Sequence, residues 1–187
     1  MAILRCVDLS RGSYQVDPND STGILTQGCT ISTSIDNCYG ISLTSDPTAQ
    51  LDTHFPDSPR QRIEFRTDAH PSGSSFSFTW KQYLSANVTT STHFFHLMQV
   101  FDMTADGPIL TLDAVKNQLT FTDFDGDKCN EDCPAVALDE YNGRTTMHSL
   151  QITFGSSGKF DYTINDADTG SKILSYSTTG QFGSNAT

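Results

Sequence analysis

The stretch "MHSLQITFGSSGKFDYTINDADTGSKILSYS", residues 147–177, decides the fold class of this chain. Apolar and polar residues alternate along it, which is the two-residue period of a β-strand with one buried face. The Gly-containing segments "GSSGK" and "DADTG" separate three such runs. The stretch therefore predicts consecutive antiparallel strands joined by tight turns.

Similar short runs occur upstream, among them "SSFSFTWKQYL" (74–84), "THFFHLMQVFD" (92–102), "PILTL" and "QLTFTDF". Turn signals such as "ADGP", "DFDGD" and "EYNGR" separate them. The first 55 or so residues read as loops with one or two short strands. We expect an all-β, antiparallel β-sandwich or jelly roll of the concanavalin A-like type, as one domain over residues 1–187.

Charge and the length of apolar runs together make two classes of partner unexpected. The chain has 22 Asp and Glu against 11 Lys and Arg, a formal net charge of −11, so nucleic acid is not an expected partner. No run approaches about 20 apolar residues, so we expect no membrane partner.

Cysteine spacing predicts two local disulfides. Cys29 pairs with Cys38 and Cys129 with Cys133, and Cys6 is left over. A zinc site at "CNEDC" is the weaker alternative, since no second Cys/His pair accompanies it.

Three N-x-S/T sequons, at Asn19, Asn87 and Asn185, favour a secreted, extracellular glycoprotein. The opening residues have no apolar core for a signal peptide, so we expect a mature form or a fragment.

The segment "RQRIEFRTD", residues 60–68, carries an unusual charge pattern. On a strand, Arg62, Glu64 and Arg66 would share one face, with Glu64 holding both guanidinium groups. Arginine binds planar carboxylates in bidentate fashion, which suits an acidic sugar. An ordinary solvated strand face is the alternative.

Two further strands would offer polar side chains to the same concave face. Lys81 and Tyr83 lie opposite an apolar set on the strand at 74–84. In the strand at 92–102, His93 and Gln99 would share one face and His96 would lie on the other.

Arg62-Ile-Glu64-Phe-Arg66, followed by Phe-His96-Leu-Met-Gln99-Val-Phe, resembles motifs of the jelly-roll polysaccharide lyases. These include the alginate lyases and, closer to this chain, the glucuronan lyases of polysaccharide lyase family 20. The resemblance covers roughly residues 53–176. It implies cleavage of a uronate-containing polysaccharide, glucuronan-type, by β-elimination.

By this resemblance Gln99 binds the substrate carboxylate, Arg62 or Arg66 supplies positive charge, and His54 or His93 is the base. Glu64, Lys81 and His96 would contact the substrate. The family's Q-I-H reads Gln99-Val-Phe here, and the chain ends before the late Tyr-containing strand. Either the chain is truncated and lacks a C-terminal strand, or Tyr83 or Tyr162 takes the tyrosine's role, or catalysis is lost.

"TDFDGDKCNED", residues 122–132, predicts a structural Ca²⁺ site. Asp123, Asp125 and Asp127 alternate around Gly126, and several hard oxygen ligands suit this cation. Glu131, Asp132 and Asp139 are additional candidate ligands, and a solvated acidic turn is the alternative.

Two functions from different classes therefore remain open. The first is a polysaccharide lyase acting on an acidic polysaccharide. The second is a non-catalytic, calcium-dependent carbohydrate-binding protein, a lectin, that binds a glycan on the same fold. A structural protein with no site is a third possibility.

Overall fold

The computed structural model describes residues 23–29, 31, 33–43 and 60–183, together with the backbone of β1 (Ile3–Asp8) and β2 (Gln15–Val16). These residues fall into two compact units. Unit 1 comprises Met1–Asp68, Trp80–Val88 and Asn142–Thr145. Unit 2 comprises Ala69–Thr79, Thr89–Tyr141 and Thr146–Thr187. Each unit is described by itself, and the assignment of one domain to the whole chain stays a prediction.

Unit 1 is built on a short antiparallel sheet. Its neighbours in order are β3 (Ile24–Gln27), β4 (Cys38–Leu43), β1 and the second half of β6 (Ser75–Leu84). The Cys29–Cys38 disulfide joins residues beside the β3–β4 pairing, as the spacing predicts. Cys29, Ile31 and Tyr83 pack against buried Ile35 and Cys38. The covalent link and this small apolar cluster together stabilise the described part of unit 1.

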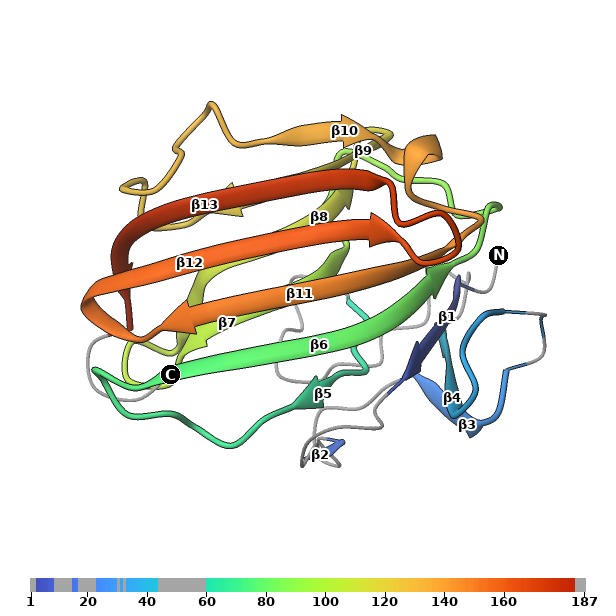
Figure 1. The fold of residues 1–187 in the computed structure, drawn as a ribbon, viewed down its shortest axis with the longest axis horizontal. Helices are drawn as coiled ribbons and strands as arrows, with labels where there is room; N and C mark the ends of the chain where they lie inside the picture. Colours follow the sequence, from blue (N-terminus) through green and yellow to red (C-terminus); the bar gives the residue numbers. More distant parts are fainter. Residues whose placement is uncertain are drawn as a thin grey trace. The chain divides into compact units, whose positions relative to one another are not determined.

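Unit 2 contains two antiparallel sheet sections (Figure 1). One has the order β13 (Lys172–Phe182), β12 (Gly155–Asp166), β11 (Thr145–Thr153) and the first half of β6. The other has the order β10 (Ala135–Ala137), β9 (Gln118–Asp123), β8 (Gly107–Val115) and β7 (His96–Asp102). Among the described residues the only helical element is the short 3₁₀ turn η1 (Leu138–Glu140).

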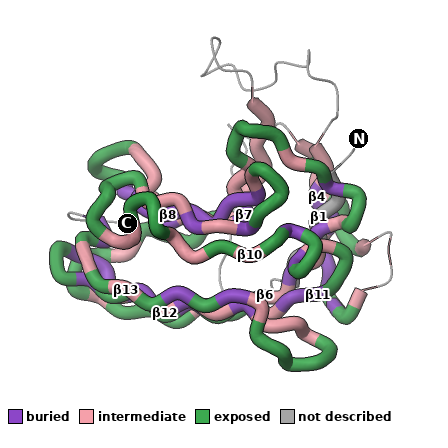
Figure 2. The backbone as a smooth tube through the Cα atoms, turned by 90° about the horizontal axis from the view of Figure 1, so that it is seen from above, coloured by how far each residue is buried: buried purple, intermediate pink, exposed green. Residues whose placement is uncertain are grey.

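The two sections pack face to face around an aromatic core. Phe121 of β9 lies 5.9 Å from Phe160, 5.6 Å from Tyr162 and 4.9 Å from Tyr176, measured between ring centroids. Figure 2 shows the two layers of unit 2, with β7 and β8 in one and β12 and β13 in the other. The predicted all-β class with antiparallel sheets is confirmed and fits a sandwich. The jelly-roll connection stays a prediction.

Alternating burial follows the predicted pattern in the segment that decides the fold. Phe160, Tyr162 and Ile164 of β12 are buried, and the residues between them are not. The register places Tyr162 opposite Leu150 of β11 and Tyr176 of β13. One face of this section therefore forms the core and the other meets solvent.

The predicted turns are held by aspartate side chains. In "DADTG", Asp166 Oδ1 accepts the N–H groups of Asp168 and Thr169, both at 2.9 Å. Asp102 likewise accepts the N–H groups of Thr104 at 2.7 Å and Ala105 at 3.2 Å before β8 begins. These Asx turns are the reason that the Asp-rich segments reverse the chain.

No helix among the described residues has the length and apolar character needed to cross a membrane.

Candidate functional site

The charged motif at residues 62–66 belongs to unit 1 and forms less strand than predicted. Only Phe65 and Arg66 are in a strand, β5, which pairs with β2. Arg62 Nε lies 3.3 Å from Glu64 Oε1, so the Arg62–Glu64 part of the expected ion-pair arrangement is present. The prediction of a strand over the whole motif is wrong, because β2 pairs with only two of its residues.

Lys81 and Tyr83 also lie in unit 1 and already have structural contacts. The Lys81 ammonium donates to the Ser34 carbonyl oxygen at 2.9 Å. Tyr83 packs against the cluster of Ile35 and Cys38. Both side chains therefore have a structural role within unit 1, whatever else they do.

The other predicted site residues lie in unit 2 or outside the described residues. Gln99, His93 and His96 lie in unit 2, apart in the chain from the motif at 62–66. His54 lies outside the described residues. Of the predicted catalytic set, Gln99 and His93 lie in unit 2, whereas Arg62, Arg66 and Tyr83 lie in unit 1.

A β-bulge at Leu97 changes which side chains of β7 share a face. His96 pairs with Asp113 of β8, but Met98 already pairs with Leu112. One extra residue in β7 therefore lies between two consecutive residues of β8. Gln99 consequently lies opposite Thr111. Asp113 and Thr111 are two positions apart on β8, so their side chains point to the same face of the sheet. Their partners His96 and Gln99 therefore share that face as well. The prediction that these two side chains lie on opposite faces is wrong.

The Asp113 cluster, defined as His96, Thr111, Asp113 and Thr122, occupies this face. Asp113 Oδ1 contacts His96 Nδ1. Asp113 Oδ2 accepts the hydroxyl groups of Thr111 at 2.8 Å and Thr122 at 2.6 Å. Asp113 is 1% exposed, whereas the His96 side chain is 25% exposed. A buried carboxylate therefore holds an imidazole that solvent reaches.

These hydrogen bonds select one tautomer of His96. Both threonine hydroxyls donate to Oδ2, so the carboxylate acts as an acceptor and Nδ1 carries the proton toward Oδ1. In the neutral ring, Nε2 then has the lone pair, and no polar contact to Nε2 is found among the described residues. A carboxylate that orients an imidazole in this way prepares it to accept a proton at Nε2.

Two phenylalanines lie around this histidine. The Phe94 ring stacks on the imidazole at 4.2 Å between centroids and an interplanar angle of 11°. The Phe124 ring meets it edge-on at 6.3 Å and 72°. Both phenylalanines are about half exposed.

His93, by contrast, does not join the site as predicted. Strand β7 begins at His96 rather than at Thr92. His93 is exposed in the preceding bend, where its N–H group donates to Ser91 Oγ at 3.0 Å. Its expected place on the Gln99 face of the strand is therefore wrong, since the strand does not extend that far.

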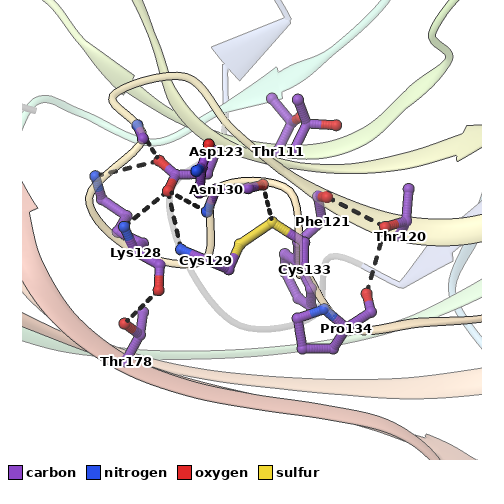
Figure 3. Close-up of a disulfide and its surroundings, with 12 residues drawn as sticks. Thr111, Thr120, Phe121, Asp123, Lys128, Cys129, Asn130, Cys133, Pro134 and Thr178 are labelled. Carbon is purple, nitrogen blue, oxygen red and sulfur yellow. Dashed lines mark hydrogen bonds and ion pairs between the residues drawn. A yellow bond between two sulfur atoms is a disulfide. The ribbon is translucent and has the colours of Figure 1, made fainter.

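The Asp123 loop, residues 123–133, contains a second buried carboxylate (Figure 3). Asp123 Oδ1 accepts the Gly126 N–H group at 3.0 Å. Asp123 Oδ2 accepts the N–H groups of Lys128 at 2.7 Å, Cys129 at 2.9 Å and Asn130 at 3.1 Å. Burial by itself would raise the pKa of Asp123, but these four donors outweigh it and lower the pKa to about 2.

The ammonium group of Lys128 lies among the three aspartates expected to bind calcium. Nζ is 3.0 Å from Asp125 Oδ2 and 3.7 Å from Asp123 Oδ1, and it also contacts Asp127. Burial would lower the pKa of Lys128, but hydrogen bonds to Asp127 and Asp125 raise it. Nζ also lies 5.2 Å from the centroid of the Phe182 ring of β13. The loop therefore contains its own buried cation.

In this geometry protein groups already contact the oxygens that Ca²⁺ would need. The Asp123 oxygens receive N–H donors, and Lys128 neutralises the other two carboxylates. In the described part of the chain no group of three or more His, Cys, Asp or Glu side chains is arranged to hold a metal. The Cys129–Cys133 disulfide closes the loop, as predicted. Calcium binding stays a prediction.

A shallow polar groove lies on the outer face of the other section of unit 2. Its volume is about 270 Å³, and its lining comprises Ser75, Phe76, Ser77, Gln151, Ile152, Thr153, Lys159 and Asp161. Lys159 Nζ contacts Asp161 Oδ2 at 2.7 Å. The groove therefore offers polar side chains to a ligand and, in its described lining, no histidine or tyrosine.

Sequence reasoning missed Asp113, Thr111, Thr122, Phe94 and Phe124. One signal for Asp113 was present: an acidic residue within the apolar run "PILTLDAV" needs a partner if that strand is buried. The bulge that supplies His96 as this partner has no comparable sequence signal.

The chain matches no protein-family model, no curated protein and no solved structure.

Proposed function

We propose that this protein is an extracellular polysaccharide lyase that cleaves a glucuronan-type polymer by β-elimination at the face of unit 2 containing His96 and Gln99. The observation that carries the proposal is the pairing of buried Asp113 with solvent-accessible His96, on the same sheet face as Gln99. The motif resemblance to jelly-roll lyases supports the same reaction class, and the two disulfides suit secretion.

The reaction begins with removal of the C5 proton of a uronate. His96 Nε2 takes this proton, and Asp113 stabilises the imidazolium ion that forms. The Gln99 amide donates to the substrate carboxylate, where negative charge accumulates when the C5–H bond breaks. Gln99 and His96 can serve one sugar because the Leu97 bulge places both on one face.

Elimination then breaks the C4–O4 bond and forms a C4=C5 double bond. In a β-1,4-linked glucuronate, H5 and O4 lie gauche on the same side of the C4–C5 bond. The proton held on Nε2 can therefore pass to the departing O4, and one imidazole acts as base and then as acid. Tyr83 is not required as the acid in this scheme.

The alternative function is non-catalytic glycan binding. The polar groove lined by Ser75, Gln151 and Lys159 favours it, because that groove can hydrogen-bond a sugar. Binding there would leave the polymer intact, whereas elimination yields an unsaturated product.

An ultraviolet absorbance assay on a panel of uronans separates these functions. The full chain should generate the absorbance of an unsaturated uronate from glucuronan, and His96→Gln should not. If the polymer binds but no absorbance develops at any pH between 5 and 9, the protein is a lectin and the lyase proposal is wrong.

A further inference from the structure

Exposed apolar rings are concentrated around His96. Among the described residues, five large apolar side chains are exposed: Ile24, Phe76, Phe94, Met103 and Phe124. Phe94, at 54% exposure, and Phe124, at 49%, both contact the His96 ring. Exposed aromatic rings beside a group with a chemical role indicate a binding surface more strongly than scattered exposed residues do.

Backbone hydrogen bonds hold the chain segments that carry both rings. The segment before β7 is tied to β8 and its turn, because Ala114 N–H donates to the Phe95 carbonyl at 2.9 Å and Lys116 N–H to the Ser91 carbonyl at 2.9 Å. Phe124 N–H donates to the Ile109 carbonyl at 3.1 Å. The two rings are therefore placed by opposite ends of β8, and little ordering is needed when a ligand binds.

Stacking on His96 covers only part of the Phe94 side chain. One face of the ring lies on the imidazole, in a nearly parallel arrangement, and more than half of the residue remains exposed. A flat apolar ring face is complementary to the C–H face of a pyranose, whose axial hydrogens carry partial positive charge. The His96 imidazole lies on the other face of the Phe94 ring, so His96 would meet a neighbouring unit of the polymer rather than the stacked sugar.

We propose that Phe94 and Phe124 form a stacking subsite for a β-1,4-linked pyranose of the gluco configuration. In β-glucuronate every ring substituent is equatorial, so both faces present only C–H groups. The axial hydroxyl of mannuronate interrupts one face and weakens the stacking. This inference rests on the proposed function for the position of the polymer next to His96. It adds the two rings that select the sugar configuration.

Calorimetric titration of the full chain tests this subsite. The probes are hexasaccharides of β-1,4-glucuronate, β-1,4-mannuronate and β-1,4-glucose, added to a His96→Gln variant so that turnover does not interfere. The glucose hexamer has the same C–H faces and no carboxylate, so it reports stacking independently of β-elimination.

Phe94→Ala and Phe124→Ala, each added to the His96→Gln variant, should each weaken binding of the glucuronate and glucose hexamers about tenfold. Phe94→Tyr, which keeps the ring, should restore binding. Met103→Ala removes an exposed apolar side chain of the β7–β8 turn and should change nothing. Mannuronate should bind about tenfold more weakly than glucuronate and respond less to loss of the rings.

Equal affinities with and without the rings would overturn the inference, as would the absence of binding by all three hexamers. Ring-dependent binding by the His96→Gln variants, with no unsaturated product from the chain that keeps His96, would refute the lyase proposal and keep the subsite. Unsaturated product formed at the wild-type rate by Phe94→Ala and Phe124→Ala chains that keep His96 would refute the subsite and keep the lyase proposal. Matching thermal unfolding curves for all variants exclude misfolding as the cause of lost affinity.

Discussion

Two buried aspartates on the β8–β9 hairpin are held in very different ways. Asp123 receives four backbone N–H groups and lies 3.7 Å from the buried Lys128 ammonium. Asp113 Oδ2 accepts hydrogen bonds from two threonine hydroxyls. Its Oδ1 contacts His96, whose side chain is partly exposed. The first carboxylate is satisfied within its own loop. The second orients a side chain that a ligand can reach.

The comparison teaches that a buried carboxylate is a functional candidate when its partner is titratable and accessible. Backbone amides and an internal lysine do not change protonation near neutral pH, so the Asp123 loop serves structure. The His96 ring is accessible and is held by Asp113, so the Asp113 cluster can serve chemistry. The more acidic sequence motif, "DFDGD", is thus the less reactive of the two regions.

The largest expected effect is on turnover. Gln99→Ala and His96→Gln should each lower kcat on glucuronan by about 10²–10⁴-fold, because one removes the carboxylate donor and the other the base. Absorbance of the unsaturated product measures the rate, and far-ultraviolet circular dichroism checks that the fold is kept. An active Gln99→Ala protein would remove the carboxylate clamp from the mechanism.

The next effect is on stability and concerns the Asp123 loop. Asp123→Asn replaces an acceptor of four N–H groups by an amide that also donates, so it should destabilise the protein by about 2–3 kcal/mol. Asp125→Asn is the matched control, because that carboxylate is 45% exposed and contacts only Lys128 among the loop groups. Urea unfolding compares the two, and equal losses would contradict the special role of Asp123.

The pH dependence sharpens the same point. Asp123 has a folded-state pKa of about 2, below its ordinary value of 3.8. Its stabilisation is therefore fully present above pH 4 and is lost as the pH falls through 2, a change of about 2 kcal/mol. The stability difference between wild type and Asp123→Asn should shrink over this window. A constant difference down to pH 2 would show that the Asp123 charge is not responsible.

The smallest effect concerns calcium. Because Lys128 already lies among the three aspartates, Ca²⁺ or EDTA should shift the unfolding midpoint of the wild type by less than about 1 °C. Lys128→Met removes the internal cation, so Ca²⁺ should stabilise this variant more than the wild type. A wild-type protein that EDTA destabilises strongly would instead confirm the calcium site that the sequence predicts.

The sequence predicted those features that depend on local pattern. Alternation at Phe160, Tyr162 and Ile164 anticipated the buried face of β12, and "DADTG" anticipated the turn that Asp166 holds. The two short-range disulfides also follow from local spacing. Each of these features is determined by residues close together in the chain.

Features that depend on pairing with distant residues could not be predicted in this way. The side of β7 on which His96 lies depends on the Leu97 bulge, which exists only relative to β8. The length of β5 depends on β2, and the role of Lys128 depends on how its loop folds back onto the aspartates. Sequence patterns therefore could not show that His96 and Gln99 share a face of β7.

The most direct test compares the two aspartates in one assay of unsaturated product formation on glucuronan. Asp113→Asn, which disturbs the orientation and tautomer of His96, should lose at least about 99% of the rate. Asp123→Asn, measured where it remains folded, should keep the wild-type rate. Full activity in Asp113→Asn would contradict the assignment of chemistry to the cluster around His96.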